Sequence, residues 1–328
     1  MVTLRRAGMA LLLLVAAAAC TGTEEPPLEL LLAVGAGDAV VFYPAGTDAA
    51  DEVGRWSLGA PVVDLVRAEG EARLWVLAPD ALRAYPLQNS RSDRGPDPVA
   101  ASVELPLGVD CSEGALELGA THLLVQCGMD VWTVALDDPA LEPVDTSADP
   151  EGTLYLLGPD DRVVRVQPTL SGFHLVYPQP PDDPLEYDAG ALAGVAALAA
   201  AWSADRLGVA LGSGPPADAS FYLWTAGSTE PPRAEAALRD LSEPRWVQPL
   251  QDGWLVGGAA AYLLRREGKD DVVRSGGYLD VAVTPDAYAY LLAPGRLVVL
   301  DLLDPNLSEH VRAVDAQAAA IAFFPASE

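Results

Sequence analysis

The first regular segment of the chain reads Leu-Leu-Leu-Ala-Val-Gly-Ala-Gly-Asp-Ala-Val-Val-Phe-Tyr (residues 30–43). Two apolar runs flank a short Gly-Asp turn, which is the pattern of the two strands of a β-hairpin. Six further segments repeat this pattern, and they lie at 74–85, 122–134, 154–166, 207–224, 254–264 and 288–300. The turns centre near residues 36, 79, 128, 159, 214, 258 and 294, so the mean spacing is 43 residues. The chain is therefore built from a repeated unit of that length.

Two further strands flank these hairpins. Less regular strands precede them at 62–66, 245–248 and 278–282, and more polar strands follow them at 233–239, 270–274 and 308–314. Strands that are covered on both faces read as continuous apolar runs, whereas charges on an exposed edge strand discourage pairing with other chains. The unit is thus a four-stranded sheet, and a four-stranded repeat of ~40–45 residues is typical of a propeller blade.

The two ends of the chain complement each other. The chain opens with a hairpin and an outer strand but no inner strand, and it closes with an apolar strand at 318–324 that no hairpin follows. Joined, these parts complete one blade, and a blade cannot bury its faces alone. We therefore expect an all-β, seven-bladed β-propeller that forms a single domain over 28–328, with residues 318–324 paired beside 28–34. A β-sandwich and two smaller β-domains are the alternatives.

The repeat pattern resembles the broad group of WD-repeat and YVTN-like propellers over nearly all of the chain after residue 27. The diagnostic strings of that group are missing, because no Trp-Asp pair, Asp-box or double glycine recurs. The blade after residue 145 is the least regular. Its inner strand is expected at 147–152, residues 178–190 read as a stiff polar insert, and a short helix is an alternative for 189–203.

The N-terminus has the three zones of an export signal. Arg5 and Arg6 precede an apolar run of 13 residues, 7–19, which small residues connect to Cys20. Such a run is too short to span a bilayer, which takes ~20 residues, but it fits a signal peptide. The segment Ala17-Ala18-Ala19-Cys20 resembles the lipobox of bacterial lipoproteins, with alanine at 17 where leucine is usual. The resemblance implies a signal peptide over 1–19, lipid on Cys20 and a tether over 20–27; an ordinary cleaved signal is the alternative.

These features predict an extracytoplasmic protein that is lipid-anchored to the cell membrane or the outer membrane. The formal net charge is −27, and a surface of that sign repels nucleic acid and anionic lipid headgroups. We therefore expect an envelope protein, a peptide or a glycan as the partner, with membrane association through the lipid anchor only.

Cys111 and Cys127 remain as one even pair once Cys20 is assigned to lipid. Outside the cytoplasm a disulfide is the usual state of such a pair. A metal site and free thiols are the alternatives, but a metal site would need further ligands, and only His122 is close in the sequence.

The predicted inner strands offer only acids for chemistry. No Gly-x-Ser-x-Gly, His-Glu-x-x-His, Walker or Rossmann motif occurs. The histidines fall on an expected middle strand (His122) and on expected outer strands (His174 and His310).

Four acids are candidates for the channel: Asp64, Glu117 and Asp280 on expected inner strands, and Asp149, which is expected to join them. Converging carboxylates could bind Ca²⁺, which takes hard oxygen ligands. The alternative is a solvated channel mouth with no cofactor. Two classes of function follow, a binding or scaffold module that is not an enzyme and a channel-centred, lactonase-like hydrolase or lyase.

Overall fold

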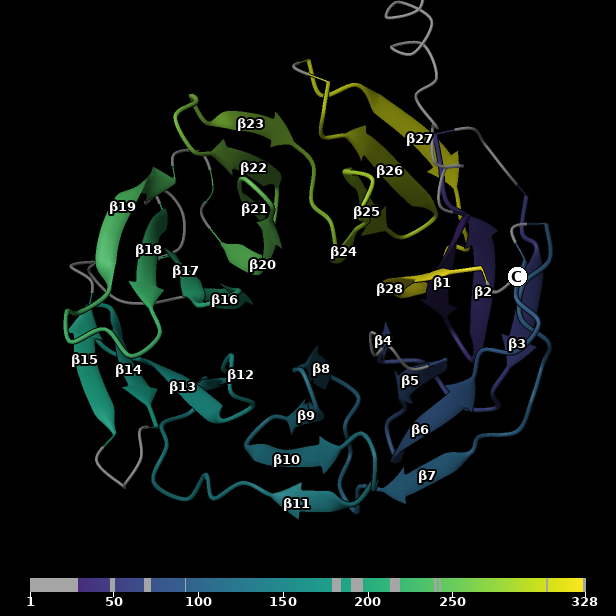
Figure 1. The fold of residues 1–328 in the computed structure, drawn as a ribbon, viewed down its shortest axis with the longest axis horizontal. Helices are drawn as coiled ribbons and strands as arrows, with labels where there is room; N and C mark the ends of the chain where they lie inside the picture. The colour runs from purple at the N-terminus through teal and green to yellow at the C-terminus, as the bar shows by residue number, and fades with distance from the viewer. Residues whose placement is uncertain are drawn as a thin grey trace, which may run out of the picture.

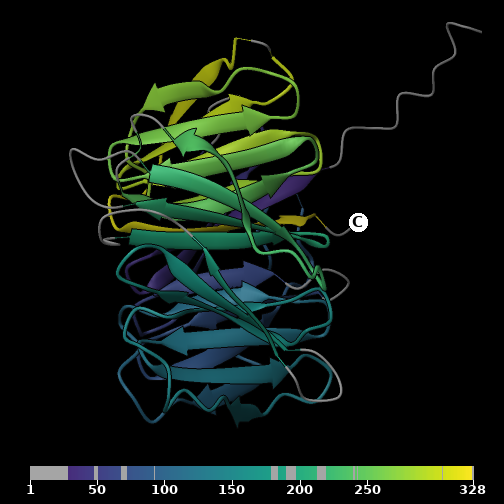
Figure 2. The ribbon, with the colours of Figure 1, turned by 90° about the vertical axis from the view of Figure 1, so that its left-hand side faces the viewer.

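The computed structural model describes residues 29–47, 51–67, 72–91, 93–178, 184–189, 197–212, 219–238, 241, 243–304 and 306–326. These residues form seven antiparallel sheets of four strands each, arranged as a ring (Figure 1). Seen from the side, the strands run roughly along the axis of the ring, so the connecting loops gather on its two faces (Figure 2). The predicted seven-bladed, all-β propeller is confirmed. No helix in the described part of the chain is long and apolar enough to cross a membrane.

Each blade contributes one strand to each of four concentric layers. The inner strands of blades 1 to 7 are β28 (Ala318–Pro325), β4 (Asp64–Arg67), β8 (Ala115–Leu118), β12 (Leu154–Leu157), β16 (Ala197–Ser203), β20 (Pro244–Leu250) and β24 (Asp280–Val283). The second strands are β1 (Leu30–Ala36), β5 (Arg73–Leu77), β9 (His122–Cys127), β13 (Val163–Pro168), β17 (Arg206–Gly212), β21 (Gly253–Gly258) and β25 (Tyr288–Ala293). The third strands are β2 (Ala39–Pro44), β6 (Ala81–Pro86), β10 (Asp130–Ala135), β14 (Phe173–Tyr177), β18 (Ala219–Thr225), β22 (Ala261–Arg266) and β26 (Arg296–Asp301). The outer strands are β3 (Gly54–Ser57), β7 (Val103–Pro106), β11 (Leu141–Pro143), β15 (Leu185–Ala189), β19 (Arg233–Leu238), β23 (Val272–Ser275) and β27 (Glu309–Ala313).

The core lies between the blades. Within the described chain, a hydrophobic cluster fills each of the seven interfaces between neighbouring blades. Successive side chains of a strand point to opposite faces, so one strand serves two interfaces. In β1, Leu31 and Ala33 pack toward blade 2, whereas Leu32 and Val34 pack toward blade 7. This is why the whole of β1 is buried and reads as a continuous apolar run.

The ring closes as the sequence predicts. β28 pairs antiparallel with β1, from Leu30 opposite Pro325 to Ala36 opposite Ala318. The backbone amide of Ala326 donates a hydrogen bond of 2.8 Å to the carbonyl oxygen of Glu29, so the first and last described residues lie side by side. The C-terminal end of the chain supplies the inner strand of the first blade.

In blade 4 the strands of the predicted hairpin occupy other positions in the sheet than expected. The hairpin at 154–166 was expected to hold the two middle strands, but it holds the inner strand β12 and the second strand β13. The expected inner strand at 147–152 is wrong, because this segment forms turns, with Gly152 at a positive φ of 81°. The segment expected to be an insert, 178–190, contains the outer strand β15, and β16 replaces the helix considered for 189–203.

The predicted disulfide is present. Cys111, in the loop before β8, is bonded to Cys127 at the end of β9, with the Cα atoms 4.9 Å apart. Both residues belong to the cluster between blades 2 and 3, where Cys111 is 1% exposed.

Candidate functional site

A cavity of about 760 Å³ opens in the centre of the ring. It is lined by residues from the inner strands of all seven blades, including Arg67, Leu118 and Val283 at the ends of β4, β8 and β24. The cavity therefore lies toward the face where the inner strands end. Most of its wall is apolar, with the side chains of Trp202 and Phe323 the largest.

Asp64 and Asp280 occupy equivalent positions, because each is the first residue of an inner strand. Oδ1 of Asp64 accepts the Leu65 amide at 2.7 Å and Oδ2 accepts the Leu116 amide of blade 3 at 2.7 Å. Oδ1 of Asp280 accepts the Val281 amide at 2.7 Å, and Oδ2 accepts the Ile321 amide of blade 1 at 2.8 Å. Each carboxylate thus joins its blade to the next one.

These hydrogen bonds provide acceptors for backbone amides at the free edges of the inner strands. An inner strand has a neighbour on one side only, so the amides on its other edge lack a ladder partner. Asp64 and Asp280 each supply an acceptor to one such amide on the next blade. Burial deep in the ring raises the pKa of Asp64 to about 7, with a further contribution from the negative charge of Asp280, and it raises the pKa of Asp280 to about 6.

Glu117 is the third residue of β8 and lines the cavity. Its carboxyl receives a hydrogen bond from the backbone of Leu157 in blade 4, but Oε2 is buried without a partner. Burial raises the pKa of this carboxyl well above its ordinary value, and the Leu157 bond lowers it by less. Glu117 therefore differs from Asp64 and Asp280, since part of its hydrogen-bonding capacity is unused.

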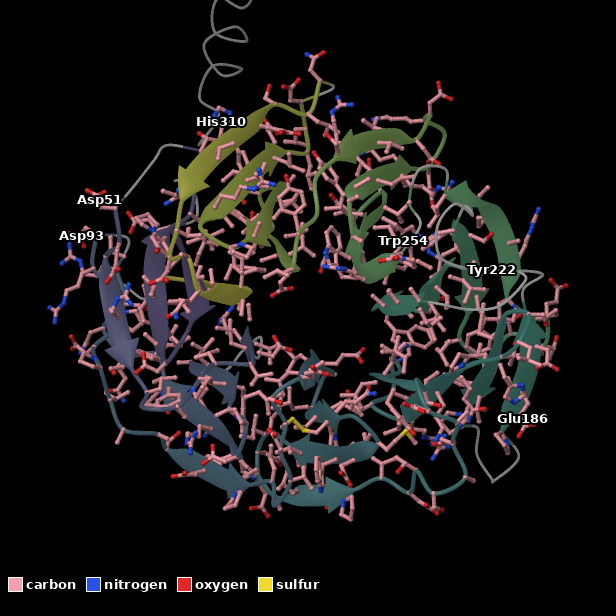
Figure 3. All side chains as sticks on the ribbon, turned by 180° about the vertical axis from the view of Figure 1, so that it is seen from behind. Asp51, Asp93, Glu186, Tyr222, Trp254 and His310 are labelled. Atoms are coloured by element: carbon pink, nitrogen blue, oxygen red, sulfur yellow. A yellow bond between two sulfur atoms is a disulfide. The ribbon has the colours of Figure 1, made fainter. Side chains whose placement is uncertain are left out.

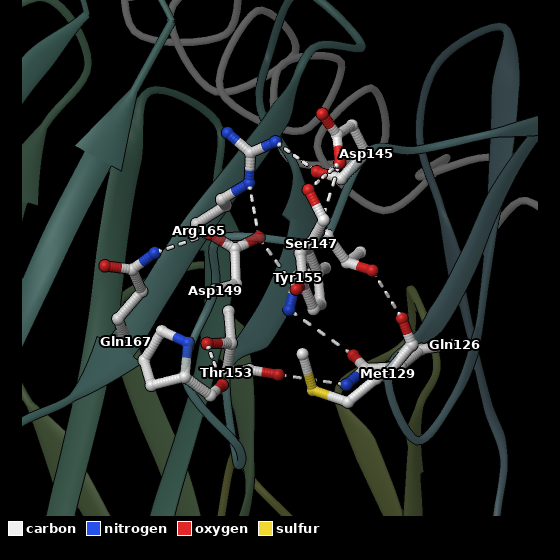
Figure 4. A network of polar contacts seen from close by, with 11 residues as sticks. Gln126, Met129, Asp145, Ser147, Asp149, Thr153, Tyr155, Arg165 and Gln167 are labelled. Atoms are coloured by element: carbon white, nitrogen blue, oxygen red, sulfur yellow. Dashed lines mark hydrogen bonds and ion pairs between the residues drawn. The ribbon is translucent and has the colours of Figure 1, made fainter.

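Asp149 lies in the loop before β12, outside the cavity lining, so the expectation that it lies on an inner strand is wrong. Its Oδ2 accepts the Tyr155 hydroxyl at 2.8 Å and lies 3.0 Å from Nε of Arg165 (Figure 4). Its Oδ1 accepts a hydrogen bond of 2.8 Å from the side-chain amide (Nε2) of Gln167. These contacts fix the turn-rich segment 145–153 against β12 and β13.

The four acids do not form one constellation. The negative charge of Asp280 raises the pKa of Asp64, whereas burial is what raises the pKa of Glu117. In the described residues no group of three or more His, Cys, Asp or Glu side chains could hold a metal ion. A Ca²⁺ ion takes 6–8 oxygen ligands, so these acids as placed do not fit such a site.

The histidines lie away from the cavity. His122 begins β9 as expected, with Nδ1 3.7 Å from Asp161, and His310 lies on the outer strand β27. His174 was expected on an outer strand but lies on the third strand β14, where Nδ1 is 2.9 Å from Asp188. The labelled acids Asp51, Asp93 and Glu186 lie at the outer rim with His310 (Figure 3).

Sequence reasoning missed the aromatic wall of the cavity. Trp202 stands in the segment for which a helix was considered, and Phe323 was seen only as part of the closing strand. Successive side chains of an inner strand point to opposite faces, and this alternation could have revealed them. Phe324 packs between blades 1 and 2, while its neighbour Phe323 lines the cavity.

The fold and the cavity place the chain among seven-bladed β-propellers. No protein-family model matches it, and no curated protein does. A functionally unknown protein from Desulfotomaculum acetoxidans matches with a TM-score of 0.62 at 10% identity, covering 90% of this chain and 99% of the other. A protein from Bacteroides uniformis, provisionally assigned as a 6-phosphogluconolactonase, gives 0.62 at 11% identity with the same coverage. A protein from Lactobacillus plantarum gives 0.53 at 10% identity, again covering 90% and 99%. These likenesses show the fold.

Proposed function

We propose that this protein is a binding module of the cell envelope, tethered to a membrane through lipid on Cys20 and without catalytic activity of its own. Its partner is an envelope protein, a peptide or a glycan in the same extracytoplasmic space. The observation that carries the proposal is how Asp64 and Asp280 are used in the ring.

A general base needs a lone pair within reach of a substrate proton. Each oxygen of Asp64 and of Asp280 accepts a backbone amide at 2.7–2.8 Å. The same arrangement occurs on two blades, at the same strand position, which is the mark of a structural element of the repeat. These two inner-strand acids thus support the joints between blades.

Two assays on the same preparations test the proposal. The full-length protein, purified from native membranes, is used to recover bound partners and is assayed for turnover of lactones, esters and glycosides. The double variant Asp64→Asn/Asp280→Asn is compared with Asp137→Asn/Asp138→Asn, which removes two exposed acids from the β10–β11 loop.

We expect a saturable partner to be recovered by the wild type and by the folded variants, with no turnover by any of them. Turnover by the wild type that the folded Asp64/Asp280 variant loses and the Asp137/Asp138 variant keeps would establish the alternative, a channel-centred hydrolase. Failure to recover any saturable partner would refute the binding module.

A further inference from the structure

We propose that the central cavity binds a small organic cation, an apolar molecule that carries a protonated amine, with Glu117 as its counter-ion. This site goes beyond the proposed function, because it requires neither the tether nor the envelope partner. The ligand would enter the ring itself, whereas a protein or glycan would contact the outside of it.

The first argument is the unpartnered oxygen of Glu117. Oε2 is fully buried and has no hydrogen-bond partner in the described chain. Buried polar atoms are nearly always paired, and leaving one unpaired is destabilising, more so for a charged group. An ammonium group has three N–H donors and no acceptor, so, once Glu117 turns Oε2 toward the cavity that it lines, the ammonium supplies both the missing hydrogen bond and the opposite charge.

The second argument is the contrast with the neighbouring acids. Asp64 and Asp280 also lie deep in the ring, but both of their oxygens are occupied by amides of their own strand and of the next blade. Glu117 receives only the Leu157 bond. Of these three acids, Glu117 alone has a buried oxygen without a hydrogen bond in the described residues, and it is the one that lines the cavity.

The third argument is the wall around Glu117. The cavity, at about 760 Å³, falls within the ~300–1,000 Å³ typical of small-molecule sites. Leu118, Leu157, Ile321, Trp202 and Phe323 give it apolar and aromatic surface. Such surface suits an apolar body, and the aromatic faces attract a cation.

The net charge of the protein also favours a cation as the ligand. The formal net charge of −27 draws cations toward the ring and repels anions. Arg67 is the other charged side chain of the lining, and it has an interaction partner of its own.

The proposal predicts a proton linkage. The raised pKa means that the free protein holds a proton on Glu117 at pH values where a surface glutamate is ionised. Pairing with an ammonium favours the ionised carboxylate. Binding of the amine must therefore release a proton to the buffer.

Calorimetry of the full chain with 2-phenylethylamine tests this, with 2-phenylethanol as the uncharged analogue. We expect the amine to bind more tightly than the alcohol. Glu117→Gln should weaken amine binding at least tenfold and leave the alcohol unchanged. The matched control is Glu113→Gln, which removes an exposed carboxylate four residues away and should leave both affinities unchanged.

Proton release is measured on the wild type alone, so it does not depend on a variant that folds. The binding enthalpy of 2-phenylethylamine should differ between phosphate and Tris at the same pH by an amount that corresponds to a released proton. No binding of the amine, equal binding by the folded Glu117→Gln variant, or a buffer-independent enthalpy would each refute the proposal. None of these results bears on partner recovery, so the two proposals can fail separately.

Discussion

Replacing Phe324 by alanine tests how the ring is closed. Phe324 is 0% exposed on β28, and its ring lies 5.9 Å from that of Phe42, edge to face at 88°. It fills the cluster between blades 1 and 2, together with Trp56, Val62 and Leu65. Removing a buried phenylalanine side chain costs about 3–5 kcal/mol, because the transfer free energy is lost and a cavity remains.

That cost converts into a shift of the melting temperature. Unfolding entropy is about 2.1 cal/mol/K per residue, so a propeller of about 300 residues has an unfolding entropy near 0.6 kcal/mol/K. A loss of about 3–5 kcal/mol then lowers the melting temperature by about 5–8 °C. Differential scanning calorimetry measures this shift, and urea unfolding gives the free energy independently.

Phe323→Ala is the matched control, since it removes the same side chain from the next residue. Phe323 is only partly buried and lines the cavity. We expect its loss to cost about 1 kcal/mol, because much less apolar area leaves water. Equal shifts for the two variants, or a shift under about 2 °C for Phe324→Ala, would refute the argument that β28 closes the ring through its buried face.

Three further predictions concern other parts of the chain. Replacing Cys111 and Cys127 by serine should lower the free energy of unfolding in urea by about 3 kcal/mol, because the bond closes a loop with a sequence separation of 16; an unchanged midpoint would contradict this. Stability should fall as pH rises from about 4 to about 7, because the raised pKa values of Asp64 and Asp280, about 7 and about 6, make the folded state bind more protons than the unfolded one in that window. The total change is on the order of 7 kcal/mol, and the Asp64→Asn/Asp280→Asn variant should show a flatter pH profile in thermal melts; an equal slope would refute it. Mass spectrometry of the native N-terminus should find Cys20 as the first residue, carrying acyl chains, and Cys20→Ala should leave the membrane fraction; a mature chain that starts elsewhere would refute the anchor.

The fold could be predicted because burial on both faces leaves a strong sequence signal. β1 and β21 are buried throughout, and they stand in the sequence as apolar runs beside a turn. Blade 4 was mis-phased because its inner strand β12 is as apolar as a second strand, and Gly158-Pro159-Asp160-Asp161 resembles the turns between middle strands. In the other blades the predicted turn joins the second and third strands, and in blade 4 that turn lies between β13 and β14.

For the candidate site, the sequence could predict which strands carry the acids but not the contacts that the acids make. Asp64, Glu117 and Asp280 do lie on inner strands, but sequence does not reveal which of their oxygens are occupied. The amides that bind Asp64 and Asp280 lie 52 and 41 residues further along, on the next blade. Such contacts form only when the ring is assembled. Whether both oxygens of a carboxylate accept hydrogen bonds, as in Asp64 and Asp280, or one does not, as in Glu117, therefore depends on the tertiary structure.

The position of β28 has a consequence for how the molecule is made. Blade 1 takes its other three strands from residues 30–57, yet its inner strand is made only after the other six blades. Until then the clusters on both sides of blade 1 lack Ala318, Ile321 and Phe324. The nascent chain must therefore keep the apolar edge of β1 from pairing with other strands while the other six blades are made, and β28, a strand of eight residues, ends that exposure in one step.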